Sequence, residues 1–472
     1  MDRLGPSAPA LELAAALHRR ELSAVELLDA CLERVDELNG ELAAVVWRND
    51  EDARAAAAEA DRRLAAGEQA PFLGVPLPIK DLTPVAGWPV SYGSHSAPPE
   101  PSAESELVVT ALERAGFVLC GRTNTPEFGL ITVAENKRYG ITRNPWDPAR
   151  SPGGSSGGAA AAVAAGMFPL AHANDGGGSI RIPASYCGLV GLKPSRGRVP
   201  RLAQSWLGAV VEGVLTRTVA DSAVVLDAIS WIDPQAWYNA PAPERPFAEE
   251  TRTPRRRLRI GLMAEAPLGI PTDAHCSAAA GAAASALESL GHAVEEVQVP
   301  TVSEELIAPF IVLTQGGLAD YDGVDWSAVE PHIAHQRRLS SETSAYDYVL
   351  AANALERISR LQTARWGRDF DVLVTPTSAI LPPPAGKILE AAHAAPEEPV
   401  PEVVASVSFT AFGNVTGLPA ISLPLHSTEE ELPVGVQLVA GPWQEGPLIA
   451  LAAQLESALP WADRRPAMRQ IA

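Results

Sequence analysis

The fold is decided in the middle of the chain, where the sequence SPGGSSGG (residues 151–158) is followed by NDGGGSIR (residues 174–181). The apolar segment between these two glycine-rich clusters predicts a helix and then a strand. A helix of about ten residues advances ~15 Å, and a strand of about five residues returns ~16 Å in the opposite direction. We therefore expect Ser155 and Ser179, one in each cluster, at the same end of an α/β layer, where open sheets place their sites.

The second cluster is suited to holding negative charge. Gly176, Gly177 and Gly178 can adopt backbone angles that aim successive N–H groups into one concavity. Such a concavity can bind an oxyanion. One glycine-rich turn alone would most simply be a connection, whereas two such turns, each with a serine, favour a catalytic site.

Two other interpretations of this stretch are weaker. A phosphate-binding loop needs a lysine after its glycines, and no lysine follows either cluster. Ser155 satisfies the G-x-S-x-G pattern of a nucleophile elbow, but that elbow follows a strand, and the loop-forming sequence NPWDP precedes this one. If a serine of this stretch is a nucleophile, it therefore does not lie on a nucleophile elbow, and it needs a base.

Lys80 is the candidate base. It ends the apolar run 75–79, which predicts a short buried strand. Burial disfavours a charged ammonium and lowers a lysine's pKa, so that a neutral amine can accept a proton. The nearest histidine, His172, falls on the expected strand and is more simply a packed neutral residue than a base.

The rest of the chain predicts an α/β protein with one large, mixed, twisted sheet covered by helices on both faces. We expect a single domain of 472 residues, with N-terminal helices over 8–66, a catalytic core over about 70–230 and a second lobe over about 255–472 on the same sheet. Ser23, with Glu26 three positions later, forms the pattern of a capping box. The region 382–402, rich in Pro, Ala and Glu, is expected to be a loop.

Composition excludes several classes of function. Thirty-seven basic against fifty-seven acidic residues give a net charge of −20, which repels nucleic acids and anionic membranes. The four cysteines, Cys31, Cys120, Cys187 and Cys276, have no CxxC spacing and no nearby His pair that would complete a zinc site, so we expect them reduced and buried. The start of the sequence shows no export signal, and no apolar stretch is long enough to span a membrane. We predict a cytoplasmic protein without a metal or a cofactor.

Several ordered motifs resemble the amidase signature family. They are GVPLPIKD (74–81), TNTPE (123–127), NPW (144–146), GSSGG (154–158), DGGGSIRIPA (175–184), CGLVGLKP (187–194), GLPAI (417–421) and GVQL (435–438). The chain differs from the common family pattern at Ala159 and Arg122, and at Asn174 and Gly176 on either side of Asp175. None of these departures removes a candidate catalytic residue.

The resemblance implies a Ser-Ser-Lys triad, with Ser179 as nucleophile, Ser155 as the proton-relaying serine and Lys80 as base. It implies a cis peptide between residues 154 and 155, and an oxyanion hole of backbone N–H groups at Gly176, Gly177, Gly178 and Ser179. Asp175 and Arg181, which flank the nucleophile, are expected to pair and hold its loop. The implied reaction is acyl transfer to Ser179 followed by hydrolysis.

The Asn-Asp pair at 174–175 and the sequence RNPW (143–146) are similar to bacterial amidases that act on nylon oligomers and aryl amides. We therefore expect a small-molecule substrate, an uncharged non-peptide amide such as an anilide or a carbamate (urethane), with side activity on esters. Gly129, Leu130, Ile131 and Trp206 are the expected pocket walls, and the protein is expected to be a monomer or a homodimer. The alternatives are the glutaminase subunit of a tRNA-dependent amidotransferase and a non-catalytic binding protein on the same scaffold.

Overall fold

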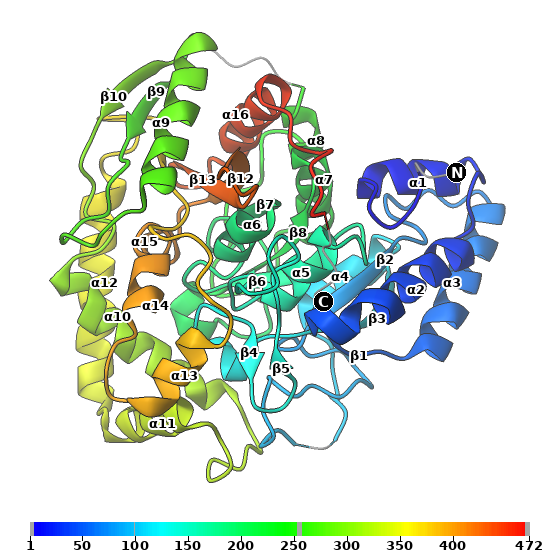
Figure 1. Cartoon of the computed structure of the whole chain (residues 1–472), viewed down its shortest axis with the longest axis horizontal. Helices are drawn as coiled ribbons and strands as arrows, with labels where there is room; N and C mark the ends of the chain where they lie inside the picture. The colour runs from blue at the N-terminus through cyan, green and yellow to red at the C-terminus, as the bar shows by residue number, and fades with distance from the viewer. Residues whose placement is uncertain (1–3, 99, 253–256, 468–472) are drawn as a thin grey trace.

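An eight-stranded sheet organises the chain in the computed structural model, which describes residues 4–98, 100–252 and 257–467. Its strands are β6 (Ala171–Asp175), β7 (Val190–Lys193), β8 (Val211–Thr216), β9 (Arg259–Leu262), β10 (Ala293–Glu296), β11 (Val372–Pro376), β12 (Ala420–Ser427) and β13 (Pro433–Ala440). Their spatial order is β10-β9-β11-β13-β12-β7-β8-β6 (Figure 1). β10, β9 and β11 run parallel, and all other pairs are antiparallel.

The predicted large mixed sheet is thereby confirmed. Strands from the predicted core and from the predicted second lobe lie together in it, while the division of the chain into those regions stays a prediction.

A separate three-stranded sheet has the order β1-β3-β2 and contains β1 (Val45–Trp47), β2 (Pro76–Lys80) and β3 (Val118–Thr123). The short strands β4 (Glu135–Asn136) and β5 (Gly140–Ile141) form a hairpin. Lys80 is therefore the last residue of a strand outside the large sheet.

Helices cover both faces of the large sheet. Along β13, Val434, Val436 and Leu438 enter the main apolar cluster, whereas Val439 enters a second cluster, as the two-residue period of a strand requires. α7, α9 and α16 contribute to the first cluster and α15 to the second. The helices are α1 (Ala10–His18), α2 (Ala24–Leu42), α3 (Asp50–Ala65), α4 (Leu107–Arg114), α5 (Gly157–Ala164), α6 (Arg181–Cys187), α7 (Val219–Ile229), α8 (Phe247–Glu250), α9 (Ala274–Ser289), α10 (Glu304–Gly316), α11 (Pro331–Glu342), α12 (Ala345–Thr363), α13 (Lys387–Ala394), α14 (Pro401–Val407), α15 (Ala411–Thr416) and α16 (Glu445–Ala458).

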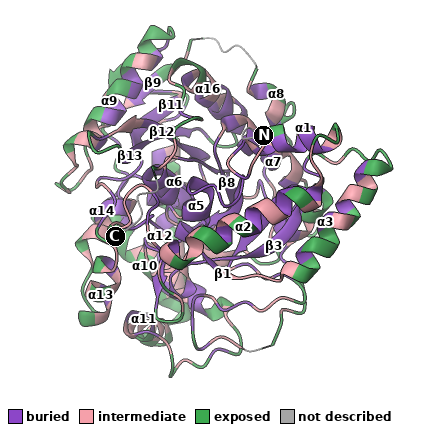
Figure 2. Cartoon of the chain, turned by 45° about the vertical axis from the view of Figure 1, so that its right-hand side comes forward, coloured by how far each residue is buried: buried purple, intermediate pink, exposed green. Residues whose placement is uncertain are grey.

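Local sequence signals fix several helix ends. Ser23 accepts a hydrogen bond from the Glu26 N–H, and the Glu26 carboxylate accepts one from the Ser23 N–H, so the predicted capping box begins α2. The buried faces of α2 and α3 turn toward the body, and their charged faces turn outward (Figure 2). All four cysteines are buried and free of disulfides.

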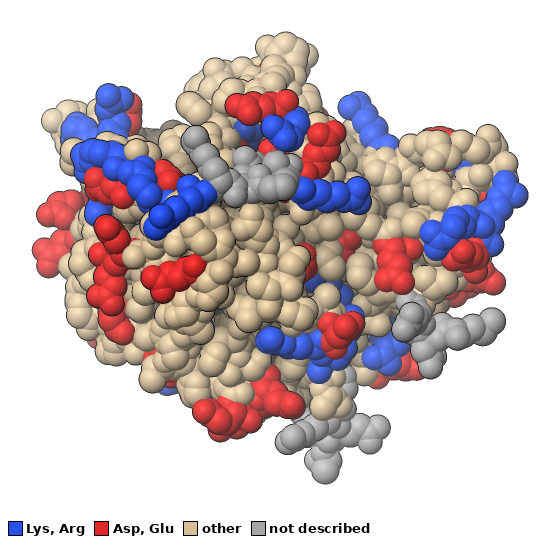
Figure 3. All heavy atoms as spheres, turned by 90° about the horizontal axis from the view of Figure 1, so that it is seen from above, with Lys and Arg blue, Asp and Glu red and all other residues tan. Residues whose placement is uncertain are grey.

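The structure differs from the sequence expectation in two places. The region 382–402 is not simply a loop, because it contains α13. The strand predicted between the two glycine-rich clusters begins only at Ala171, after Pro169, whose nitrogen has no hydrogen to donate to a strand ladder. Among the described residues, no helix combines the length and apolar character that a membrane crossing requires. On the face seen from above, basic and acidic side chains are interspersed (Figure 3).

Candidate active site

Lys80 lies at the centre of the candidate site. It ends β2 and is fully buried, and its Nζ lies 2.7 Å from Ser155 Oγ and 2.7 Å from Asn174 Oδ1. Burial lowers the pKa of Lys80 to about 7, although Glu212 and Asp175 act in the opposite direction by attracting its positive charge. The amine is therefore poised to exchange a proton with the Ser155 hydroxyl near neutral pH.

The two glycine-rich clusters meet at the start of α5 and the end of β6. Ser155 precedes α5 and is buried, and the peptide that joins it to Gly154 is cis, as the family resemblance implied. Ser179 follows β6 and is half-buried. The Ser156 N–H donates to the Ser179 carbonyl oxygen at 3.3 Å, so the backbones that carry the two serines lie side by side.

The oxyanion donors differ from the predicted set at one position. The Gly178 N–H donates to Asp175 Oδ1 at 2.8 Å, so it is not free to bind a substrate oxygen. Of the predicted donors, this leaves the N–H groups of Gly176, Gly177 and Ser179 as candidates to bind a substrate oxygen. Gly178 has φ +139°, and a Cβ there would lie 2.5 Å from Thr410 Oγ1, so the turn depends on glycine at this position.

A buried ion pair holds the loop of Ser179. Asp175 Oδ1 lies 2.8 Å from Arg181 Nη2, and both side chains are fully buried. Burial alone would raise the pKa of Asp175, but the charge and hydrogen bonds of Arg181, with Lys193 and Asn414, hold it well below its usual range. Asp175 Oδ2 also accepts the N–H of Ile180 at 3.1 Å. The carboxylate thus binds the backbone on both sides of Ser179.

Two expected wall segments reach the site. A Cβ added at Gly129 would lie 3.4 Å from Ser155 Oγ, and Leu130, half-buried, packs against the apolar cluster that contains Phe128. Ile131 is also half-buried and follows in the chain. Trp206 packs against Gly176, where a Cβ would lie 2.7 Å from Cζ3 of the indole.

The indole of Trp206 also contacts the edge of another ring. The ring centroids of Trp206 and Phe310 lie 6.2 Å apart at 85°, and Phe310 lies closest to the position that a Cβ at Gly177 would occupy. The wall beside the candidate oxyanion donors is therefore aromatic.

The sequence did not predict that Asn174 contacts Lys80. Asn174 is a direct hydrogen-bond partner of the amine, and the only hint of this was the departure from the family pattern before Asp175. Beneath the lysine, His172 Nδ1 accepts the Lys80 backbone N–H at 3.4 Å. His172 Nε2 in turn lies 3.0 Å from Glu212 Oε2, and Glu212 Oε1 lies 2.8 Å from Arg201 Nη1. Because Nδ1 accepts the backbone hydrogen, Nε2 is the ring nitrogen that donates to Glu212.

Comparisons with known proteins agree with this architecture. A family model described as Amidase matches residues 26–449. The chain is 35% identical over 477 residues to a 6-aminohexanoate-cyclic-dimer hydrolase of Pseudomonas sp. (strain NK87), covering 94% of each chain. The solved structure of a 6-aminohexanoate cyclic dimer hydrolase complexed with substrate superimposes with a TM-score of 0.90 at 32% identity, over 98% of this chain and 99% of that one. A bacterial aryl acylamidase superimposes with a TM-score of 0.87 at 26% identity, over 96% of each chain.

The fold and these relatives define an enzyme that hydrolyses amide bonds. The chain belongs to the amidase signature family, which confirms the resemblance seen in its motifs.

Proposed function

We propose that this amidase hydrolyses small, uncharged, non-peptide amides through an acyl-enzyme on Ser179, with Ser155 as proton relay and Lys80 as base. The observation that carries the proposal is the 2.7 Å contact between Lys80 Nζ and Ser155 Oγ, made by a fully buried lysine whose pKa is lowered to about 7. A lysine held in this way is chemically unlike a surface ammonium.

The proposed reaction begins at that contact. The neutral amine of Lys80 takes the proton of Ser155 while Ser155 takes the proton of Ser179, whose oxygen attacks the substrate carbonyl. The N–H groups of Gly176, Gly177 and Ser179 stabilise the resulting oxyanion; removal of one such donor typically costs ~3 to 4 kcal/mol of barrier. The relay then returns a proton to the leaving nitrogen, and water repeats the sequence on the acyl-enzyme to release the acid.

The walls of the site indicate the substrate class. Trp206 and Phe310 form an aromatic wall beside the candidate oxyanion donors. Gly129 lies beside Ser155, and Leu130, the next residue, packs against the apolar cluster that contains Phe128. Apolar walls with few polar groups favour uncharged ligands. The names of the relatives, a 6-aminohexanoate-cyclic-dimer hydrolase and a bacterial aryl acylamidase, support aliphatic amides, cyclic ones included, and anilides first, with urethanes and esters as secondary substrates.

The test is a rate screen of the purified chain on anilides, linear amides, carbamates and esters, together with a fluorophosphonate probe. We expect hydrolysis of at least one amide class by the chain alone, and a labelled peptide that contains Ser179. Ser179→Ala should abolish both turnover and labelling without changing the circular dichroism spectrum. Labelling of another serine would refute the assignment of the nucleophile. Failure of the chain alone to turn over any amide would favour a partner-dependent glutaminase subunit.

The cytoplasmic location and the monomeric or homodimeric state predicted from the sequence stay predictions. Sedimentation of the purified chain measures the second of these directly.

A further inference from the structure

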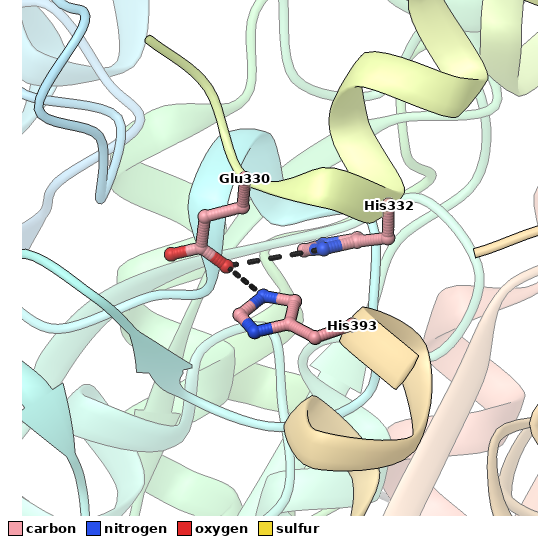
Figure 4. A group of neighbouring side chains, drawn as sticks. All are labelled: Glu330, His332 and His393. Carbon is pink, nitrogen blue, oxygen red and sulfur yellow. Dashed lines mark hydrogen bonds and ion pairs between the residues drawn. The ribbon is translucent and has the colours of Figure 1, made fainter. Parts of the chain in front are cut away.

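Three potential metal ligands converge away from the catalytic lysine. Glu330 precedes α11, His332 is the second residue of that helix, and His393 is the last but one residue of α13. Glu330 Oε2 lies 2.8 Å from His393 Nε2 and 3.8 Å from His332 Nδ1. One ligand atom from each residue lies within 4.8 Å of the others. Figure 4 shows the carboxylate and the two imidazoles facing one another across the junction of the two helices.

His332 provides an independent sign that something is bound there. Its side chain is only 7% exposed, and neither ring nitrogen has a hydrogen-bond partner among the described residues. An imidazole buried without any partner is costly.

The carboxylate is held in place as ligating carboxylates usually are. Glu330 Oε1 accepts the Lys137 N–H at 2.6 Å, which leaves Oε2 turned toward the two histidines. Pro331 fixes the backbone between Glu330 and His332. Hydrogen bonds to the oxygen that does not ligate are the usual means of orienting a metal ligand.

We propose that Glu330, His332 and His393 form a binding site for a divalent transition-metal cation, and that zinc is its preferred occupant. Two imidazoles and one carboxylate match the ligand chemistry of zinc. A tetrahedral zinc ion with ligand bonds of ~2.0 to 2.1 Å sets its ligand atoms ~3.3 Å apart. The two distances from Glu330 Oε2, 2.8 Å and 3.8 Å, lie on either side of that value. Water would complete the coordination.

The site would join two helices to a wall of the catalytic pocket. The ligands tie α11 to α13, and the backbone N–H of Glu330 donates to Glu127 Oε2 at 2.7 Å. Glu127 belongs to the segment that continues through Phe128 to Gly129, which lies beside Ser155. A bound ion would therefore stabilise the wall of the pocket and would take no part in the proton relay.

The experiment measures zinc binding by the full-length chain after removal of any affinity tag. The protein is stripped with a chelating resin, titrated with Zn²⁺ against a competing fluorescent chelator, and melted with and without zinc. His335→Ala is the matched control, because His335 lies on the same helix, is only half-buried and is absent from the cluster. The test variants are His332→Ala, His393→Ala and Glu330→Gln.

We expect about one zinc per chain for the wild type and for His335→Ala, with a higher melting temperature when zinc is present. Each test variant should lose affinity by at least about 100-fold and should lose the thermal shift. His393 is partly exposed, so His393→Ala decides the matter if His332→Ala does not fold. Equal zinc affinity in wild type and His393→Ala would overturn the proposal, as would wild-type binding no tighter than that of a stripped unrelated protein.

Discussion

Asn174 and Ser155 flank the amine of Lys80 at equal distances of 2.7 Å. A neutral amine has two hydrogens and one lone pair. When one hydrogen points to the carbonyl oxygen of Asn174, the lone pair can face the Ser155 hydroxyl. Asn174 therefore orients the amine of Lys80, the proposed base, and places a polar carbonyl oxygen beside it.

The first prediction concerns the pH dependence of turnover. Lys80 is a base only when neutral, so kcat/KM should rise with pH through an apparent pKa of about 7. Lys80→Ala should lower kcat by about 10²- to 10⁴-fold and remove this acidic limb. Lys193→Met is the control, since burial also lowers the pKa of Lys193 to about 7 but its Nζ bonds to the Pro194 carbonyl. If Lys193→Met lost the acidic limb and Lys80→Ala kept it, the limb would belong to Lys193 and the assignment of Lys80 as base would be wrong.

Asn174→Asp tests the electrostatics of the same contact. The substitution keeps the shape of the side chain and places a negative charge beside the amine, which favours the ammonium and raises the pKa of Lys80. The acidic limb should move to higher pH by ~1 to 3 units, with little rate left at pH 7 and recovery above pH 8. The measurement is a full pH profile of kcat/KM on one substrate.

Glu212→Gln should shift the profile in the opposite direction. The carboxylate of Glu212 raises the pKa of Lys80 by its charge, so neutralising it should move the acidic limb to lower pH by about 1 unit. Glutamine can still accept the His172 Nε2–H, which preserves the hydrogen bond beneath the lysine. Shifts of the same sign in Asn174→Asp and Glu212→Gln would contradict the assignment of the limb to Lys80.

A fourth prediction concerns stability. Asp175→Asn leaves the guanidinium of Arg181 buried without its partner, which should lower the free energy of unfolding by about 3 to 5 kcal/mol. Asp369→Asn removes a pair with Arg365 at the surface and should change stability little, because solvent screens exposed charges. Urea denaturation of both variants and the wild type makes the comparison.

The fifth prediction addresses the aromatic wall. Trp206→Ala removes the contact with Phe310 and should raise KM for anilides by up to about tenfold, with a smaller change for aliphatic amides. Trp237→Ala is the matched control, because Trp237 is 96% exposed. No change in KM for either substrate class would place Trp206 outside the pocket, and an equal change for both would contradict a specific contact with the aryl group.

Much of the fold was predictable because its signals are local. The apolar run before Lys80 and the capping box of Ser23 and Glu26 specify a strand and a helix start from neighbouring residues alone. The division of the strands between the eight-stranded and the three-stranded sheet was not predictable, since strand pairing is set by contacts between residues far apart in the chain. α13 was missed because Pro, Ala and Glu are also common in loops.

The features of the site that were predictable from the sequence are also those that depend on residues close together in the chain. The paired glycine clusters, with serines 24 positions apart, predicted where Ser155 and Ser179 meet, whereas no spacing links Lys80 to Asn174 across 94 positions. The sequence did not indicate that the Gly178 N–H donates to the side chain of Asp175, because that bond depends on the backbone angles of the turn. His393 lies 63 positions from Glu330, so their proximity appears only in the folded chain.

Lys80 ends a strand of the three-stranded sheet, and Ser179 follows a strand of the eight-stranded one. The bond from the Lys80 N–H to His172 crosses the same boundary. The activity should therefore depend on the contact between the two sheets, and a separation too small to change the helical content would still move Lys80, the proposed base, away from Ser179, the proposed nucleophile. On heating, this enzyme should lose activity through separation of the two sheets before either sheet unfolds.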